Sequence, residues 1–214
     1  MIVFRHKKTG EAAYLSHIYA MRVLQRTMRR MKAEVKYSEG FVPHMITYTT
    51  TPLPLGVQSL AEYFTADSPL TDETYLLERF NECAPVGMRA DFCAVTEKNP
   101  NLAAKVVASA YEVASEEKIS SEVEGILSLD EYVMKQLKKG VELDVEVRKK
   151  IFSLKAEGNK LYMLLATGNE NLRVDSFVQS LARYGVKACA NDIVRIEQYA
   201  SVGGEFVAAK EILK

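Results

Sequence analysis

The sequence is poor in cysteine, has no long hydrophobic run and carries no excess charge of either sign. Its three cysteines, Cys83, Cys93 and Cys189, are odd in number and scattered over 214 residues, so we expect buried, inert thiols and no disulfide framework. The spacing of Cys83 and Cys93 fits no zinc motif. No apolar run approaches the roughly 18 residues that span a bilayer, and residues 1–6 lack a signal-peptide layout. We therefore expect a cytoplasmic protein that binds neither a metal nor a membrane.

Glycine-rich phosphate-binding motifs are also missing. Neither the P-loop pattern nor the dinucleotide fingerprint occurs, so we expect no cofactor held by these motifs. The composition that remains, 48% hydrophobic and 26% charged, is that of an ordinary globular protein. A chain of 214 residues is long enough for one large domain or two small ones, each with its own core.

The net charge is zero, but the charge is unevenly distributed along the chain. Residues 1–50 hold nine Lys and Arg against three Asp and Glu, a net charge of +6. Residues 51–100 hold three basic residues against eight acidic ones, a net charge of −5. This asymmetry indicates either a basic surface that faces a polyanion or two opposite patches that meet inside the fold.

The first half of the sequence predicts elements in the order β-α-β-β-α-β, which is the ferredoxin-like split unit. Residues 2–8 alternate as a strand does, and Ser16 is expected to cap a helix. One apolar face of that helix is formed by Ile18, Met21, Leu24, Met28 and Met31. The other expected elements are strands at 35–37, 45–51, 61–66 and 88–96, and a helix that Thr71 caps and that ends before Pro85.

The second half repeats this order. We expect a strand at 105–114, a helix from Ser121 or Ser128 to Leu137, and strands at 145–156 and 160–166 joined by a turn at Gly158-Asn159. A helix at 173–184, ended by Gly185, and a strand at 193–199 follow. The sequence therefore predicts an α+β protein of two tandem ferredoxin-like (βαββαβ) units with antiparallel sheets, one at 1–98 and one at 103–214, separated near Asn99-Pro100-Asn101.

The most distinctive stretch runs from Tyr37 to Gly56 and holds two glycines, three prolines and His44. It contains Tyr37-Ser38-Glu39-Gly40-Phe41, Pro43-His44 and Pro52-Leu53-Pro54-Leu55-Gly56. Gly40 and Gly56 are expected to supply backbone conformations closed to other residues or a close approach. Upstream lies Tyr14-Leu15-Ser16-His17, followed by a helix that ends with Arg29-Arg30, and downstream lies Glu62-Tyr63.

Together these motifs resemble the bacterial radical-SAM-linked family, a domain of unknown function found beside, or fused to, radical SAM proteins. The resemblance is specific over residues 14–63 and implies a radical SAM protein as partner. It implies that the motif residues Ser16, Ser38, Glu39, Gly40, Phe41, Pro43, Pro54, Gly56 and Glu62 are structural. The chain lacks the three-cysteine cluster motif that a radical SAM enzyme needs, so it is not that enzyme itself.

The chain departs from the family pattern at four positions. Tyr19 stands where the family usually has an acid. Val42, Met45 and Ile46 replace an asparagine, a proline and a lysine in the segment around His44. Loss of the asparagine and lysine weakens the case for an anion contact at that turn.

Four arginines of the first helix are predicted to share one face. Arg22, Arg26, Arg29 and Arg30 are spaced by four, three and one residues, which keeps them on the side opposite the methionines. The planar guanidinium group suits phosphate, so this face is a candidate RNA-binding surface. The alternative is a solvated basic face that pairs with Glu34 or Glu39.

The two histidines in these segments are the other candidate site residues. His17 and His44 are expected to shape or contact bound RNA. With Tyr37, they are also the candidates for a general acid and base. A metal site is incomplete, because only Glu39 lies near them in the sequence. The structural alternative is that His17 donates to a backbone carbonyl at the helix start and His44 braces the turn at Pro43.

Three functions remain open, and the sequence favours the first. It is a non-catalytic RNA-binding accessory that presents RNA to a separate radical SAM partner. The second is a metal-independent endoribonuclease of the tandem ferredoxin-like type, and the third is a protein-binding scaffold. A pseudouridine synthase is disfavoured because no Arg-Thr-Asp motif occurs.

Two further predictions concern single residues. The candidate base-stacking residues are Tyr48, Tyr63 and Phe64. Glu62 is expected to anchor Arg5 or an arginine of the helix.

Overall fold

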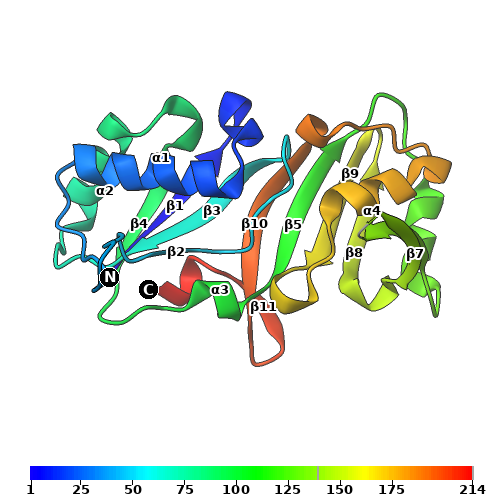
Figure 1. Ribbon diagram of the computed structural model, residues 1–214. Helices are drawn as coiled ribbons and strands as arrows, with labels where there is room; N and C mark the ends of the chain where they lie inside the picture. The colour runs from blue at the N-terminus through cyan, green and yellow to red at the C-terminus, as the bar shows by residue number, and fades with distance from the viewer. Residues whose placement is uncertain (139, 214) are drawn as a thin grey trace.

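The computed structural model describes residues 1–138 and 140–213, with the side chains of 137 and 138 left aside, and its main feature is one nine-stranded, mostly antiparallel sheet (Figure 1). Its path runs β4-β1-β3-β10-β5-β9-β8, while β2 pairs with β3 and β11 with β10. The strands are β1 (Ile2–Lys8), β2 (Thr47–Thr49), β3 (Gln58–Ala66), β4 (Ala90–Val95), β5 (Val106–Ala114), β8 (Ile151–Glu157), β9 (Lys160–Ala166), β10 (Ile193–Val202) and β11 (Glu205–Ala208). A separate hairpin pairs β6 (Val133–Lys138) with β7 (Val141–Glu146).

The helices are fewer and mostly short. They are α1 (His17–Arg30), α2 (Glu73–Cys83), α3 (Leu102–Lys105) and α4 (Val174–Ser180). Short 3-10 turns connect them: η1 (Gly10–Tyr14), η2 (Val86–Met88), η3 (Ser121–Ser128), η4 (Arg148–Lys150), η5 (Gly168–Glu170), η6 (Ala182–Tyr184), η7 (Ala190–Asp192) and η8 (Glu211–Leu213). The α+β class is therefore as the sequence predicts. No helix in the described part of the chain is long and apolar enough to cross a membrane.

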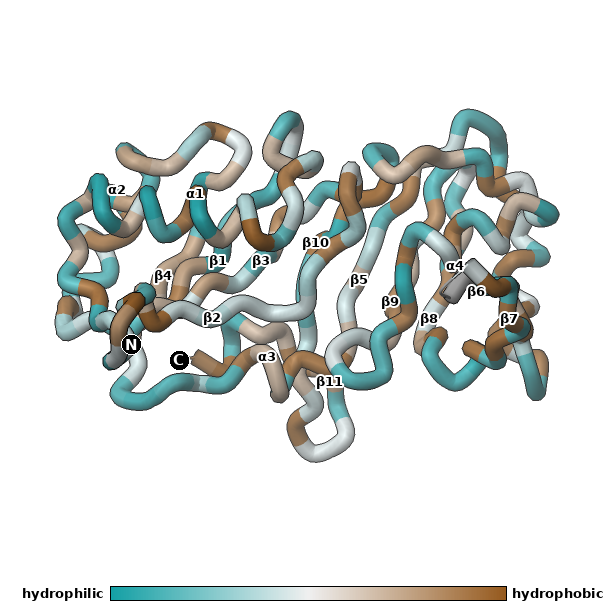
Figure 2. Tube along the Cα trace, in the orientation of Figure 1, coloured by the Kyte–Doolittle hydropathy of each residue, from teal (hydrophilic) through white to brown (hydrophobic). Residues whose placement is uncertain are grey.

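Helix α1 forms where the sequence predicts it. The Ser16 hydroxyl accepts a hydrogen bond from the Tyr19 amide and so caps the first turn, as expected. Hydrophobic and hydrophilic residues alternate along the helix (Figure 2). The apolar side, including Leu24 and Met28, is buried with residues of α2 in one core that covers β1 and β3. Burial of this face holds α1 across the first half of the sheet.

The first half of the chain (residues 1–98) and the second half (residues 103–214) share the sheet. Strands β3 and β10 pair in parallel at Val194 with Gln58 and Arg195 with Ser59. After β10 the chain turns back through β11 and η8, and Ala209 is buried with Val3 of β1. The last described residues therefore pack against the first half.

Two turn predictions are confirmed by the structure. Strands β8 and β9 form a hairpin in which Glu157 pairs with Lys160, and Gly158 adopts a positive φ of 65°. The helical segment of α4 and η6 ends at Gly185, whose φ is 83°. Glycine is the residue that reaches such angles without strain, so these positions mark chain reversals reliably.

The largest difference concerns the helix expected between Ser121 and Leu137. The structure has the 3-10 turn η3 followed by the hairpin β6–β7. Tyr132 and Met134 are buried, whereas the residue that follows each of them, Val133 and Lys135, is exposed. This alternation is the period of a strand. The alternation outweighs the helical propensity of the segment.

Other expected boundaries also shift. Asp72, and not Thr71, caps α2 by accepting from the Tyr75 amide at 3.0 Å. The strand expected at 35–37 is reduced to a single bridge between Tyr37 and Met45. The strand expected at 145–156 is broken into β7 and β8 by η4. The three cysteines are free, as expected, but only Cys93 is buried and Cys189 is exposed.

Candidate functional site

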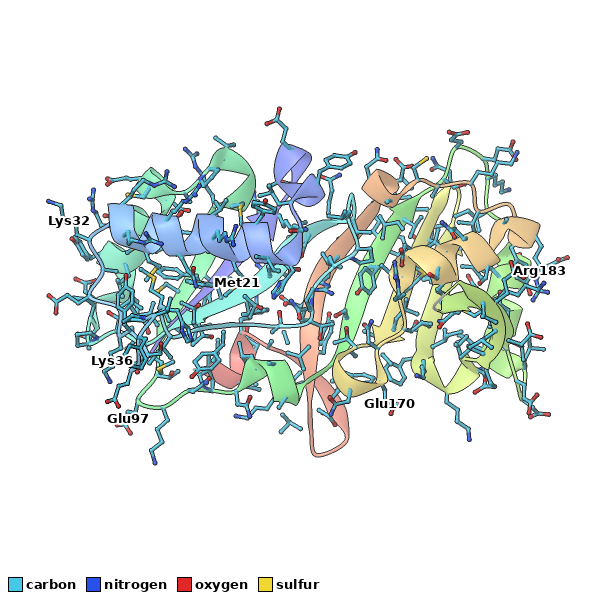
Figure 3. All side chains as sticks on the ribbon, viewed as in Figure 1. Met21, Lys32, Lys36, Glu97, Glu170 and Arg183 are labelled. Atoms are coloured by element: carbon cyan, nitrogen blue, oxygen red, sulfur yellow. The ribbon has the colours of Figure 1, made fainter. Side chains whose placement is uncertain are left out.

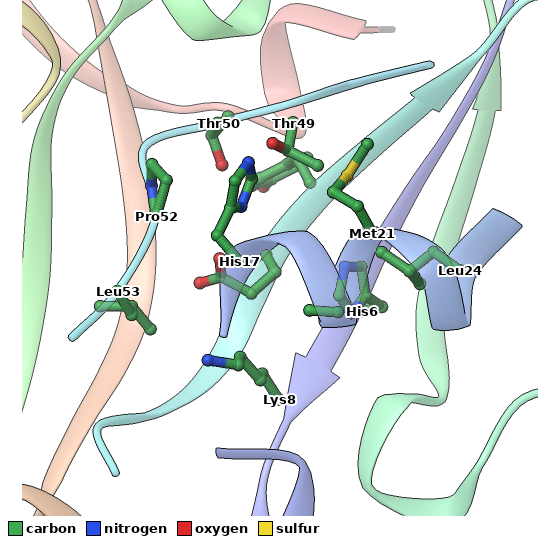
Figure 4. Close-up of a pocket in the computed structure, with 12 residues that line it drawn as sticks. His6, Lys8, His17, Met21, Leu24, Thr49, Thr50, Pro52 and Leu53 are labelled. Atoms are coloured by element: carbon green, nitrogen blue, oxygen red, sulfur yellow. The ribbon is translucent and has the colours of Figure 1, made fainter. Parts of the chain in front are cut away.

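A cavity of about 30 Å³, lined by both polar and apolar residues, lies where α1 crosses β1 and β3 (Figure 4). Segment 49–53 closes its remaining side. The polar groups that line it are His6, Lys8, His17, Thr49, Thr50 and Glu62. The cavity therefore gathers residues from four separate stretches of the first half.

The secondary structure explains how these side chains meet. His6 and Lys8 are two apart on β1, so they point to the same face of the sheet, the face that α1 covers. In the antiparallel register His6 lies opposite Glu62 of β3. His17 and Met21 are four apart on α1 and so share the side of the helix above that face.

Lys8 is buried, and its ammonium group has little to bind. Its Nζ donates to the Ala13 carbonyl at 3.3 Å, and it forms no ion pair within the described part of the chain. Burial lowers the pKa of Lys8; the charge of Glu62 acts in the opposite direction, and that of Arg195 adds to the lowering. An ammonium group has three donors, so two of them have no acceptor among the described residues.

The other polar groups of the cavity are also incompletely satisfied. The Thr50 hydroxyl is buried and finds no hydrogen-bond partner among the described residues. In Figure 4 this hydroxyl and the His17 ring point into the same space. His6 is buried, burial lowers its pKa, and its Nδ1 lies 2.7 Å from the Lys7 carbonyl oxygen. Buried polar atoms are nearly always paired, so the open ones favour a polar occupant.

A buried ion pair lies beside the cavity, with Glu62 lining the cavity and Arg195 lining the adjoining space. The Arg195 guanidinium, almost completely buried, donates to Glu62 Oε1 at 2.9 Å and to the Thr51 carbonyl at 3.0 Å. It also donates to the Tyr111 hydroxyl at 3.3 Å. Burial acts to lower the pKa of Arg195, but Glu62 and Tyr111 raise it above the ordinary value. The charge of Glu62 is thus already matched by Arg195.

Glu62 does not bind Arg5 or an arginine of α1, contrary to expectation. Arg5 forms ion pairs with Asp91 and with Glu197, the latter at 3.1 Å, and the Tyr63 hydroxyl donates to Glu197 at 2.9 Å. Burial and Glu197 raise the pKa of Tyr63. The reason is strand alternation: Arg5 pairs with Tyr63 in the register and faces the side of the sheet opposite to Glu62.

A larger groove, about 420 Å³, adjoins the cavity between the two halves of the chain. The cavity and the groove share His17, Pro52 and Leu53. The second half contributes Tyr111, Asn171, Leu172, Arg173, Val174 and Arg195. His17, at the first position of α1, thus stands where the two spaces meet.

The arginine face of α1 is exposed, as its spacing indicates. Arg22, Arg26, Arg29 and Arg30 are all solvent-exposed, and none of the ion pairs between described residues involves them. Arg22 lies over the Tyr19 ring at 5.4 Å, and Arg30 donates to the Thr27 hydroxyl. The alternative of a pair with Glu34 or Glu39 therefore has no support.

His44 has a local partner. Its Nδ1 lies 2.8 Å from the Ser38 hydroxyl, which also accepts from the His44 amide at 3.1 Å. It is exposed and is not among the residues that line the cavity with His17. The structure therefore joins His44 to Ser38 and gives it no shared site with His17.

The rest of the motif is divided between an exposed loop and a close contact. Tyr37, Glu39, Phe41 and Pro43 are exposed, and Gly40 has a φ of 120°. Pro54 lines the groove. Gly56 has a φ of 86°, and a Cβ there would lie 3.1 Å from the Cβ of Ala190. Both glycines thus have the positive φ that was predicted.

Two of the three candidate base-stacking residues are inside the protein. Tyr63 and Phe64 are buried, because β3 is central and covered on both faces, and only Tyr48 is substantially exposed.

Three residues of the cavity and its surroundings were not predicted from the sequence: His6, Lys8 and Arg195. The available signal was in β1, where charged or polar residues occupy the same alternating positions as Ile2 and Phe4.

The fold and the site define an α+β protein in which a cavity opens beside a groove between two parts of one sheet. The chain belongs to a conserved bacterial family: the family model described as "Uncharacterized protein conserved in bacteria (DUF2344)" matches residues 2–174. The match includes the cavity residues of β1, α1 and β3 and ends at the first residue of α4. A comparison with curated proteins gave no significant match.

Proposed function

We propose that the protein is a non-catalytic, cytoplasmic RNA-binding accessory that presents RNA to a separate radical SAM partner. The observation that carries the proposal is the exposed arginine face of α1, which has no acidic partner among the described residues. Exposed guanidinium groups without carboxylate partners are free to bind phosphates and to release their counterions. The proposal of a radical SAM partner rests on the resemblance of residues 14–63 to the radical-SAM-linked family.

We also propose that the two halves are tandem ferredoxin-like units, an architecture common among RNA binders. In the first half the strands lie in the order β4-β1-β3-β2, and in the second half in the order β10-β5-β9-β8. If the inserted β6–β7 hairpin is set apart, the four strands of each half can be numbered in chain order. In both halves they then lie side by side in the order four, one, three, two. This order, with antiparallel neighbours, is that of a split βαββαβ unit.

The position of α1 supports a directed path for the RNA. Its N-terminal residue His17 lines the groove, while Lys32, just beyond its C-terminal end, lies at the outer end of the first half (Figure 3). Arg22, Arg26 and Arg29 are exposed between these points. A strand that follows them reaches the groove, where His17 would contact it.

The proposal is tested with purified protein and total cellular RNA at two salt concentrations. Arg26→Glu combined with Arg29→Glu should weaken binding at least about tenfold. If each arginine contacts one phosphate, the slope of log affinity against log salt should fall by about 1.4 for single-stranded RNA. Lys118→Glu combined with Lys149→Glu is the matched control, because it changes the charge equally at exposed sites of the second half.

The outcomes separate the three functions. Unchanged affinity in the arginine variant would exclude α1 as the RNA surface. RNA cleavage that persists in chelator and disappears in His17→Ala or His44→Ala would identify an endoribonuclease instead. The absence of both binding and cleavage would leave a protein-binding scaffold, and co-purification with the radical SAM protein of the same bacterium would test that role.

A further inference from the structure

We propose that the cavity around Lys8 and the adjoining groove form a binding site for a nucleoside monophosphate, with the phosphate in the cavity and the nucleoside in the groove. The nucleotide is either free or the terminal residue of an RNA. This inference goes beyond the proposed RNA-binding surface and does not depend on the arginines of α1.

The charge balance of the cavity favours an anion. Glu62, the acidic residue among those lining it, already accepts from Arg195 at 2.9 Å. Lys8 is buried, and within the described ranges its ammonium group has the Ala13 carbonyl as its one acceptor. Burial lowers the pKa of Lys8 even though the charge of Glu62 acts in the opposite direction, and a bound anion would favour the charged form. Lysine binds phosphate as a point charge, which is the role that this geometry leaves open.

A second and independent observation is the Thr50 hydroxyl. It is buried, lines the cavity and has no hydrogen-bond partner in the described part of the chain. A buried hydroxyl left unpaired is destabilising, so an occupant that accepts or donates a hydrogen bond there is expected. A phosphate group in the cavity would offer one oxygen to Lys8 and another to Thr50, which lie on different sides of the pocket in Figure 4.

The start of α1 adds to the positive potential. Ser16 and His17 line the groove, and the first turn of this 14-residue helix contains no acidic residue. The first amide groups of a helix have no intrahelical acceptor and carry a partial positive charge. By contrast, α2 has Asp72 and Glu73 at the same place. The partial positive charge at the start of α1 is thus not balanced by a carboxylate in the first turn of the helix.

The sizes of the two spaces fit a nucleotide divided between them. The cavity, about 30 Å³, exceeds the roughly 10–15 Å³ that one buried water needs and so has room for part of a phosphate group. The groove, about 420 Å³, falls within the roughly 300–1,000 Å³ range of small-molecule sites. Leu53, Leu55, Leu172 and Val174 give the groove apolar walls suited to a base, and Asn171 supplies a hydrogen-bonding amide.

Isothermal titration calorimetry with AMP, adenosine and inorganic phosphate tests the site, alongside an RNA oligonucleotide with and without a terminal phosphate. We expect AMP or the phosphorylated RNA to bind at least about tenfold more tightly than its unphosphorylated counterpart. Lys8→Met should abolish that difference, and Thr50→Val should reduce it. Lys7→Met is the matched control, because Lys7 is the exposed neighbour on the same strand.

The ligand arms distinguish the two sources of the phosphate. Binding of AMP assigns the site to a free nucleotide, and binding of only the phosphorylated RNA assigns it to an RNA end. Equal affinity for the phosphorylated and unphosphorylated ligands, or an equal loss in Lys7→Met and Lys8→Met, would overturn the proposal. Thr50→Val removes one hydroxyl and keeps the shape, so it tests the site even if Lys8→Met does not fold. Retention of AMP binding in the Arg26 and Arg29 double variant would separate this site from the RNA surface.

Discussion

Arg195 and Glu62 exemplify how single residues hold the site. Arg195 is among the largest fully buried side chains of the described residues, and its charge is matched by Glu62 across the parallel β3–β10 pairing. A buried pair of this kind contributes little net stability, but removal of one partner leaves an isolated buried charge. The pair therefore ties the two halves together at the cavity.

Glu62→Gln should lower the free energy of unfolding by about 3–5 kcal/mol, because it leaves the Arg195 charge without a counterion. Urea denaturation followed by circular dichroism measures the change. Glu82→Gln is the control: Glu82 pairs with Arg79 on the surface, where solvent screens the two charges and loss of the pair costs little stability. Similar losses in the two variants would show that Arg195 is not electrostatically dependent on Glu62.

At the scale of elements, the site depends on how segment 51–57 is held against the second half. The segment supplies Pro52 and Leu53 to both the cavity and the groove. Near its end, the Gly56 amide donates to the Ala13 carbonyl at 3.0 Å. Gly56 also lies close to Ala190 of η7, so a glycine in the motif brings two distant stretches together.

Gly56→Ala should destabilise the protein by more than about 1 kcal/mol, since the new methyl group meets Ala190 and the φ is positive. Gly10→Ala is the control, because Gly10 also has a positive φ but has open space around its Cβ position. Thermal unfolding of both variants measures the difference. A loss no larger than that of Gly10→Ala would mean that the contact with Ala190 adjusts freely.

The sequence predicts elements better than it predicts their contacts. Helix α1, its cap Ser16 and the Gly158 hairpin follow from local patterns that their own residues determine. The Lys8 cavity does not, because it exists only once the register of β1 and β3 and the crossing of α1 are set. The two histidines were grouped because both lie in the distinctive motif segments, whereas in the structure His44 pairs with Ser38.

At the scale of the whole molecule, the two halves are joined by more than a linker. The sheet continues through β3 and β10, and η8 packs its Leu213 into a core with Val3 and Leu102. The groove lies along this junction and takes residues from both sides. A ligand in the groove would therefore contact both halves at once.

We expect the two halves to unfold as one cooperative unit, because the core that contains Val3 and Leu213 requires both. Hydrogen exchange should give β1 and β9, one in each half, the same free energy of global opening. Amides of β7, whose residues are mostly exposed, serve as an internal comparison and should exchange faster. A clearly lower opening energy for β1 or β9 alone would mean that the halves fold independently.

Strand β10 has a further consequence for how the protein is made. It follows β3 and β5 in the chain, yet it lies between them in the sheet. During synthesis, the facing edges of β3 and β5 stay open until residues 193–202 have left the ribosome. Open strand edges are templates for pairing with other chains, and closure by a strand so distant in sequence is slow. Chains in which residues 193–202 are missing or have not yet left the ribosome should thus be the aggregation-prone species of this protein.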